Sequence, residues 1–561
     1  MTAARAISRK PSSVAILGGG ISGLSAAYYV SRLLPKETKI TIFESKNRLG
    51  GFIESERFRL PEQCQNGDGK DSVLFEYGPR TLRVSKRVSS LNAFDLINKL
   101  GMKDELIVIA KDSAAARNRY VYHQGRINMI PYSLTSILKF YFSQPLFRGM
   151  LPEVIREPFR LRGPSSEAIA KDDESIGSFM TRRFGPRITD RLLSGVIHGI
   201  YAGDIYQLSV KSILEYLWKR EKTEGSIVPL WRGRGRQAGM EEVSAYRKEY
   251  AERNRRNAEE ITGTNEELLE NLKGASVISF KHGMESFVSR LTEQLSESNV
   301  DIQKGRSVRH IEPISESQGE SKITKVKLTL DDGTEQIYDQ VISALPARKL
   351  EKLVRGDRES VELAEGLGSI PSVSVGVVNL FYNKPNLLPV TGFGYLLPQT
   401  VPLADNPDRA LGVVFDSDTV ASGDDCLGPS QQNDAAGTKV TVMLGGHWWG
   451  GKKPGDVNMP SGPDEAADKA KQLIRRQLGV QEQPVVVHAM LQQNCIPQYV
   501  VGHTATLGRV HEAVLSAFDG ALALVGASYL GVSVNDCIYY ARLAAEDIAA
   551  GRRVSGLEAK L

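Results

Sequence analysis

The most constraining feature of this 561-residue chain is a glycine-rich turn between two apolar strands near its N-terminus. The apolar run Val14–Leu17 leads into Gly18-x-Gly20-x-x-Gly23, a small-residue helix follows, and a second apolar run ends at Glu44. Glycine lets the backbone turn tightly and approach a pyrophosphate, and it lets the helix pack closely on the strand. The free N–H groups at the start of the helix face the phosphates. This order of elements predicts a Rossmann-like dinucleotide cradle in an α/β fold.

A carboxylate and a second glycine pair indicate which nucleotide binds. Glu44 lies 21 residues after Gly23, where a carboxylate accepts from both hydroxyls of an adenosine ribose and repels the 2′-phosphate of NADP. Arg48-x-Gly50-Gly51 follows. These glycines let the backbone approach a flavin while Arg48 can meet a phosphate, which favours FAD over NAD. An ordinary glycine turn is the alternative.

Another strand, glycine turn and helix start lie near the C-terminus. The apolar run 521–525 is followed by Gly526, a loop through Val532 and Ser533, and the helical run Tyr539–Ala550. FAD-binding folds often use such a distant strand and helix to close over the cofactor. The N-terminus of that helix would favour the reduced, anionic flavin.

Motifs spread over the whole chain are typical of one family. They are Phe75-Glu76-Tyr77-Gly78-Pro79-Arg80, Gly199-Ile200-Tyr201-Ala202-Gly203-Asp204, Gly392-Phe393-Gly394-Tyr395-Leu396, Asn494-Cys495-Ile496-Pro497-Gln498-Tyr499 and the stretch Gly526–Cys537. On these motifs the sequence resembles the protoporphyrinogen oxidase family, of the eukaryotic mitochondrial type. That family lies within the FAD-dependent amine oxidase and phytoene desaturase superfamily.

The resemblance implies noncovalent FAD and a set of residues that bind it. They are Gly18, Gly20, Ile21, Ser22, Gly23, Glu44, Ser45, Arg48, Gly50, Gly51, Gly78, Pro79, Val308, Gly526, Val532, Ser533 and Val534. It also implies oxidation of protoporphyrinogen IX to protoporphyrin IX, the penultimate step of haem biosynthesis. This is a six-electron oxidation in three flavin turnovers, with molecular oxygen as the acceptor and hydrogen peroxide released.

Four residues are expected to bind this substrate, an apolar macrocycle with propionates at one edge. Arg80 can pair bidentately with a carboxylate, although a structural arginine paired with a local acid is the alternative. Phe393 and Leu396 resemble an apolar clamp for the pyrrole rings, although ordinary strand residues would look the same. Gly199 matches the position whose backbone approaches a pyrrole nitrogen edge. We interpret His198 as a hydrogen-bonded structural residue, so no side chain is expected to be catalytic and flavin N5 carries the chemistry.

The positions of the cradle segments predict three domains. A discontinuous FAD-binding domain comprises 11–76, 276–344 and 486–552. A substrate-binding domain with a mixed sheet comprises 77–95, 208–275 and 345–485, with surface loops at 219–273 and 417–437. A helical, membrane-associating domain comprises 96–207. The two loops are predicted from their scarcity of large apolar residues.

Composition excludes several classes of protein. The net charge of +5 is small and dispersed, which argues against a nucleic-acid partner. Four cysteines without a C-x-x-C spacing predict neither a zinc site nor a disulfide framework, and no metal is expected. No run of 18 or more apolar residues is present in the sequence, so no membrane-spanning helix is predicted.

Peripheral membrane contact remains open for the segment 132–162. It alternates aromatic and apolar clusters with lysines and arginines, which suits either an interfacial amphipathic helix or a core-facing helix pair with a solvated basic side. The resemblance favours the mitochondrial inner membrane and allows a homodimer. The segment before Val14 is too short for an ordinary cleaved transit peptide, so import would use internal information. Ala559-Lys560-Leu561 is close to a Ser-Lys-Leu peroxisomal signal, which we interpret as chance.

Two other functions are compatible with such a cradle. The nearest is an FAD-dependent amine or polyamine oxidase, but those enzymes usually place an aromatic residue where this chain has Ser533-Val534. The more distant one is a nonenzymatic binding protein of the GDP-dissociation-inhibitor type. Such proteins lose flavin contacts, whereas this chain retains both ends of the cradle.

Overall fold

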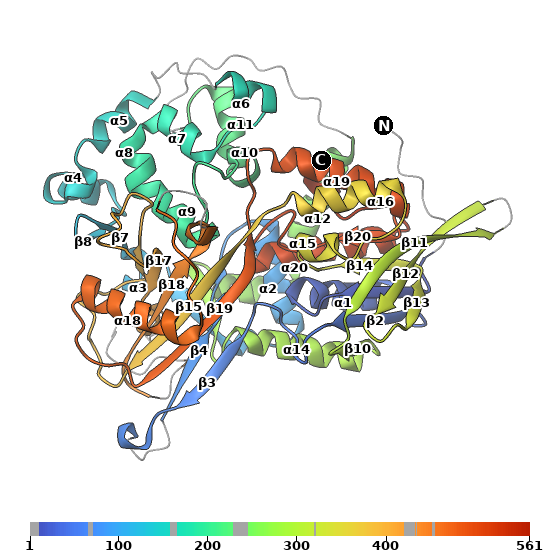
Figure 1. Ribbon diagram of the computed structural model, residues 1–561, viewed down its shortest axis with the longest axis horizontal. Helices are drawn as coiled ribbons and strands as arrows, with labels where there is room; N and C mark the ends of the chain where they lie inside the picture. Colours follow the sequence, from blue (N-terminus) through green and yellow to red (C-terminus); the bar gives the residue numbers. More distant parts are fainter. Residues whose placement is uncertain are drawn as a thin grey trace.

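The computed structural model describes residues 10–65, 71–157, 165–227, 245–318, 321–419, 432, 435–450 and 455–560. Most of the loop predicted at 417–437, the part 228–244 of the loop predicted at 219–273, and Leu561 lie outside the described residues. Figure 1 shows a five-stranded sheet on one side of the molecule, a seven-stranded sheet on the other, and a group of helices above the second.

The five-stranded sheet is parallel throughout and is assembled from three distant parts of the chain. Its strands, in spatial order, are β10 (Asp301–Lys304), β2 (Lys39–Glu44), β1 (Ser13–Leu17), β14 (Gln340–Ser343) and β20 (Leu522–Leu524). The pairs β10–β2, β2–β1, β1–β14 and β14–β20 all run parallel. The expected gathering of N-terminal, middle and C-terminal segments into one sheet is therefore observed.

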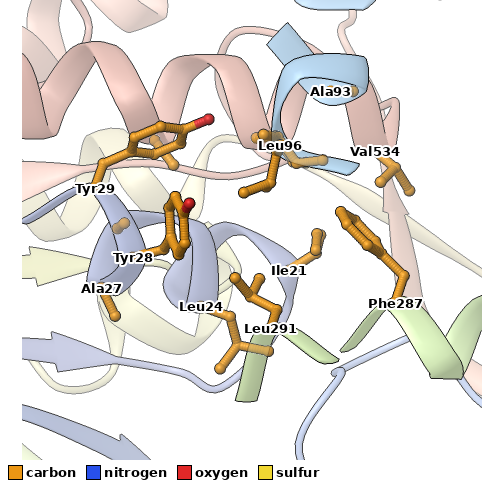
Figure 2. Packing of buried hydrophobic residues seen from close by; sticks show 14 of the residues in the cluster. Ile21, Leu24, Ala27, Tyr28, Tyr29, Ala93, Leu96, Phe287, Leu291 and Val534 are labelled. Carbon is orange, nitrogen blue, oxygen red and sulfur yellow. The ribbon is translucent and has the colours of Figure 1, made fainter. Parts of the chain in front are cut away.

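Alternate residues of β1 face opposite layers, as the two-residue period of a strand requires. Val14 and Ile16 pack under one layer of helices, while Ala15 and Leu17 pack under the other. The first layer consists of α1 (Ile21–Leu33), α2 (Val88–Lys99), α14 (Met284–Glu297) and α20 (Val534–Ala549). Figure 2 shows residues of this layer converging, with Ile21, Phe287 and Val534 near the start of α1.

The second layer combines a small sheet with three helices. It consists of β11 (Val308–Gln318), β12 (Ser321–Leu330), β13 (Glu335–Tyr338), α15 (Ala347–Glu351), α16 (Arg358–Gly368) and α19 (His503–Phe518). Both faces of the parallel sheet are thus covered, which explains why Val14–Leu17 of its central strand β1 is an apolar run without alternation.

The seven-stranded sheet is mixed, as expected for the second domain. Its spatial order is β19 (Val486–Pro497), β15 (Ser372–Tyr382), β18 (Thr438–Gly445), β17 (Ala410–Val414), β16 (Gly394–Leu396), β7 (Arg119–His123) and β8 (Arg126–Met129). Only the β16–β7 pair is parallel among the described pairs of this sheet. Helix α18 (Pro463–Leu478) packs on one face.

Two shorter strand groups and several helices complete the fold. They are β3 (Ser55–Arg59) with β4 (Ser72–Glu76), β5 (Leu82–Arg83) with β9 (Ala275–Phe280) and β6 (Leu106–Ala110), and the helices α3 (Ala114–Arg117), α12 (Ala245–Thr264), α13 (Glu266–Asn271) and α17 (Asp416–Thr419). The remaining helices are α4 (Leu134–Ser143), α5 (Met150–Arg156), α6 (Ser166–Lys171), α7 (Ile176–Phe184), α8 (Pro186–Ile188), α9 (Ser194–Tyr201), α10 (Val210–Ile213) and α11 (Glu215–Glu224). No helix within the described ranges has the length and apolarity needed to cross a bilayer.

The range 96–207 was expected to be helical, but its first part is not. Residues 106–129 contain β6, β7 and β8, and the last two extend the seven-stranded sheet. Tyr120 and Tyr122 face the core of that sheet and Val121 faces the helices beyond it, the pattern of a strand buried on both faces. The helical region begins only at α4.

Two other segments also lie elsewhere than predicted. Strand β19 was assigned to the nucleotide domain but forms an edge of the seven-stranded sheet. Helix α2, divided between the predicted substrate and helical domains, packs against α20 in the nucleotide half. Each segment follows the sheet or helix that covers its apolar face, which the sequence order alone does not reveal.

Helix α12, which lies in the surface loop predicted at 219–273, is a docked helix. It packs against α2, and Tyr250 hydrogen-bonds to Tyr539 of α20 at 3.0 Å between the hydroxyl oxygens. Arg253 forms an ion pair of 2.5 Å with Asp547, whose side chain is 5% exposed. Aromatic and guanidinium groups thus bury surface in a segment with few aliphatic residues.

Candidate active site

The turn after β1 brings two backbone segments into direct contact. A Cβ on Gly23 would lie 1.9 Å from the carbonyl oxygen of Gly18, and Gly18 has φ of +98°. Helix α1 starts at Ile21 and Gly20 is its N-cap; no side chain in the described residues caps its first turn. Its N–H groups therefore point out of the sheet edge, as an anion site requires.

Glu44 lies beside this turn at the end of β2. Its Oε2 accepts from the Gly19 N–H at 2.8 Å, and its Oε1 accepts from the Lys46 N–H at 2.8 Å. The Ser45 hydroxyl lies 3.3 Å from Oε1. The Arg306 N–H donates to the Glu44 carbonyl at 2.9 Å, which brings the start of β11, at Val308, to the same edge.

The second glycine pair packs against the first turn. The Gly50 N–H donates to the Gly19 carbonyl at 2.8 Å, and a Cβ on Gly51 would lie 3.1 Å from the Cα of Gly20. Arg48 donates to the Gly51 and Ile53 carbonyls at 2.8 and 2.5 Å. In this conformation Arg48 therefore braces its own turn, and its predicted contact with a phosphate stays a prediction.

The Gly78-Pro79 segment closes the cradle from a third side. A Cβ on Gly78 would lie 1.8 Å from the carbonyl oxygen of Phe52, and the Tyr77 N–H donates to the Glu54 carbonyl at 2.9 Å. This glycine is required because two backbone segments touch. The segment after β4 is thereby fixed against the turn that follows Gly51.

The C-terminal segment reaches the same edge. A Cβ on Gly526, at φ of +113°, would lie 3.5 Å from Oγ of Ser22. Ser533 is the N-cap of α20, where its hydroxyl accepts from the Asp536 N–H, and it is exposed. Val532 is half-buried and Val534 is buried in the helix layer.

These residues fit a flavin dinucleotide. The places where a Cβ would collide form a backbone-lined cradle, the uncapped α1 start supplies donors for a pyrophosphate, and Glu44 supplies a carboxylate for a ribose. The nearby thiol of Cys537 is buried, which raises its pKa to about 11 and leaves it uncharged. All of the residues predicted to bind the cofactor lie at or near this edge of the sheet, and their contacts with it stay predictions.

Three of the residues predicted to bind substrate lie along β16 and α9. Phe393 directly precedes β16 and Leu396 is its last residue, and both are half-buried. Gly199, on α9, packs on β16 so closely that a Cβ on Gly199 would lie 2.6 Å from Cδ2 of Leu396. The guanidinium of Arg119 lies over the Phe393 ring, 5.6 Å from its centroid. The structure therefore brings Gly199 and Leu396 together, and Phe393 lies three residues before Leu396, beside Arg119.

Arg80 is held by an acid at the start of α17, just after β17. Its Nη1 lies 2.6 Å from Oδ1 of Asp416, and the Thr441 hydroxyl donates to Oδ2 of Asp416 at 2.6 Å. The Phe415 N–H donates to the Phe393 carbonyl at 3.1 Å, which joins Asp416 to the clamp. The alternative of a structurally paired arginine is thus observed for Nη1. Nη2 is buried and has no hydrogen-bond partner among the described residues.

Two buried charged residues near Arg80, Glu76 and Lys439, were not predicted from the sequence. Glu76 is 2% exposed and accepts from the Met284 N–H at 2.8 Å and the Ser55 hydroxyl at 2.6 Å. Burial raises its pKa to about 7. Lys439, 1% exposed, donates to the Leu74 carbonyl at 2.5 Å, and burial lowers its pKa. Glu76 is within a recognised motif, but nothing in the sequence signals that Lys439 lies near it.

Comparison with known proteins agrees with this geometry. The family described as flavin containing amine oxidoreductase matches residues 21–549. Protoporphyrinogen oxidase of Schizosaccharomyces pombe is 36% identical over 539 residues, which cover 96% of this chain and 98% of that protein. Protoporphyrinogen oxidase of Homo sapiens is 33% identical over 538 residues, with 95% and 98% covered. A crystal structure from Exiguobacterium sp. 255-15 superimposes with a TM-score of 0.67 at 22% identity, over 96% and 98% of the two chains.

The cradle predicts a specific effect of adding one methyl group. Gly23→Ala places a Cβ against the Gly18 carbonyl, so we expect loss of bound flavin, measured as visible absorbance per polypeptide in the purified protein. Gly263→Ala is the matched control, because nothing lies within 4 Å of a Cβ at that exposed helical position. Full flavin content in Gly23→Ala would contradict the assignment of this turn.

Burial of Glu76 predicts a pH dependence of stability. Its pKa is raised from 4.5 to about 7 on folding, so the stability that it contributes is complete below pH 4.5 and is lost as pH rises through 7. Glu76→Gln does not titrate. The free energy of unfolding of the variant, relative to wild type, should rise by up to about 3 kcal/mol between pH 4.5 and 8. Urea unfolding at several pH values tests this, with exposed Glu297→Gln as control; a constant difference would refute it.

Proposed function

The chain belongs to the family of flavin containing amine oxidoreductases, and we propose that it is an FAD-dependent oxidoreductase that converts protoporphyrinogen IX to protoporphyrin IX. One observation carries this proposal. An apolar wall and Arg80, which has an N–H group without a described partner, lie together beside the flavin cradle. An apolar tetrapyrrole with a carboxylate edge matches that combination. The relatives named protoporphyrinogen oxidase support it over nearly their whole length.

Residues of the cradle would hold FAD noncovalently. The α1 start and the glycines at 18, 20 and 23 would bind the pyrophosphate, Glu44 would bind the ribose, and the α20 start would lie at the flavin end. When bound, FAD supplies two-electron oxidation, so a six-electron oxidation takes three turnovers with dioxygen as the proposed acceptor and hydrogen peroxide as its product.

The chain's own side chains position the substrate. Nη2 of Arg80 binds a propionate, while Asp416 keeps the guanidinium in place through Nη1. Phe393 and Leu396 cover the pyrrole rings and exclude water, and Gly199 admits a ring edge that a side chain would block. No protein nucleophile or general base is needed in this account.

An anaerobic mixing experiment tests the function. Protoporphyrinogen IX should bleach the flavin of the purified protein in the absence of air, and porphyrin fluorescence and peroxide should appear once air is admitted. A polyamine such as spermine serves as the alternative substrate. Bleaching by spermine alone would favour an amine oxidase, and a colourless protein that does not take up FAD would favour a binding protein.

Arg80 gives a prediction for substrate capture. Arg80→Ala should raise KM for protoporphyrinogen IX by about 10- to 100-fold, because a hydrogen bond to a charged group contributes roughly 1.5–3 kcal/mol. Flavin content should stay unchanged. Arg57→Ala is the control, since Arg57 donates to Ser72 and Gln432 within the neighbouring charge network. Unaltered kinetics of Arg80→Ala would remove Arg80 from the site.

We also propose that the helical region attaches the protein to the surface of the mitochondrial inner membrane. Eight of the fifteen large apolar residues exposed among the described residues fall between 132 and 216, including Phe142, 71% exposed, and Ile155, 54% exposed. Lys139, Arg148 and Arg156 are exposed nearby in sequence. Exposed apolar and basic residues together are typical of an interfacial segment. A homodimer is proposed only by the resemblance.

Membrane attachment predicts a loss of vesicle binding. Phe142→Glu should lower binding to vesicles of phosphatidylcholine and cardiolipin by about 10-fold or more, since burying one such side chain contributes roughly 1.5–3 kcal/mol. Flotation of the vesicles measures this, and Val361→Glu, at a position 55% exposed in the nucleotide half, is the control. Equal flotation of both variants would argue against the proposed face.

Fractionation of cells decides whether the protein is located in mitochondria or in peroxisomes.

A further inference from the structure

Helix α9 meets the seven-stranded sheet at a pair of histidines that the proposed function does not use. His198, on α9, is 2% exposed, and its Nε2 lies 2.9 Å from Nε2 of His447 in the turn that follows β18. Its Nδ1 lies 2.7 Å from the carbonyl oxygen of Leu397, directly after β16. One imidazole therefore joins three elements that are far apart in sequence.

The hydrogen-bond partners determine which ring nitrogens of His198 and His447 carry a hydrogen. A carbonyl oxygen only accepts, so Nδ1 of His198 donates to Leu397. Burial lowers the pKa of His198 to about 4, and the imidazole is neutral near neutral pH. Its Nε2 then accepts, and Nε2 of His447 must be the donor. The direction is fixed: His447 donates to His198, and His198 donates to Leu397.

The backbone on both sides of α9 is in contact with its neighbours. His447 N–H donates to the Ala202 carbonyl at 2.8 Å, and a Cβ on Gly446 would lie 2.2 Å from the same oxygen. On the clamp side, Gly199 packs on the Leu396 side chain. Helix α9 is thus confined between the turn after β18 and strand β16. Loss of the hydrogen bond between His447 and His198, or of that between His198 and Leu397, would alter the packing of α9 on these two neighbours.

We propose that His198 and His447 are positioning residues for substrate binding, and that their hydrogen bond fixes the separation of Leu396 and Gly199. The inference rests on the proposed function, because both of those residues belong to its substrate wall. Neither imidazole touches the substrate in this account. His198 acts through Leu397 on Leu396, and through α9 on Gly199.

The test removes the N–H donor of His447 and keeps a side chain of similar volume. His447→Leu should raise KM for protoporphyrinogen IX by about 10-fold while kcat changes by less than about 3-fold, because the lost positioning affects binding and not the flavin. Flavin content should match wild type. His447→Gln supplies an amide N–H at a similar reach, so we expect KM to return to within about 3-fold of wild type. His511→Leu, which removes a half-buried histidine bonded to Ser555, is the control.

A second measurement does not depend on turnover. Amide hydrogen exchange of the segment 394–401, followed by mass spectrometry, should be faster in His447→Leu and unchanged in His447→Gln. If His447→Leu does not fold, His198→Asn replaces it, because its amide can donate to Leu397 but is too short to reach His447. Wild-type KM and exchange in His447→Leu would overturn the proposal, as would equal impairment of the Gln and Leu variants. A wild-type protein that does not oxidise protoporphyrinogen would refute the proposed function, while the exchange comparison would still decide the role of the pair.

Discussion

Direct contact between backbones at one edge of the parallel sheet is the constraint on which the remaining structure depends. The turn after β1, the glycine pair at 50 and 51, and the segment at Gly78 meet at distances that leave no room for a Cβ. Only glycine permits such contacts, and they produce a surface of peptide groups. A surface of that kind can bind a long anionic dinucleotide along its whole length.

Buried charges connect this edge to the seven-stranded sheet. Glu76 ends β4 and Arg80 lies in the segment after it, whereas Lys439 lies in β18 and Asp416 begins α17, just after β17. Burying such groups is costly unless they are paired and hydrogen-bonded, and the structure supplies both ion pairs and backbone partners. Charges of this kind are concentrated at functional sites. We interpret the cluster as the means by which the cation of the site is held next to an apolar wall.

The parts of the fold that could be predicted are those with a local signal. The strands β1, β2 and β14 are short apolar runs, and the turn at Gly18 has its own spacing, so the nucleotide half was predicted in outline. The pairing of Arg80 with Asp416 could not be predicted, because the two are 336 residues apart and no local pattern links them. Strands β7 and β8 were missed because what places them is the free edge of β16, a tertiary feature. Docking of α12 was missed because Tyr250 and Arg253 are polar by composition yet bury surface through specific partners.

The strand order has a consequence for biosynthesis. Strand β20 and helix α20 are translated after the other strands of this sheet, yet β20 covers the edge of β14 and α20 packs on α1. A nascent chain still on the ribosome therefore carries β14 with an unpaired edge, which is a template for pairing with other chains. This edge stays open until β20 has been synthesised. A chain that stops before Leu522 lacks both β20 and α20, so β14 keeps its unpaired edge and α1 lacks the helix that packs on it.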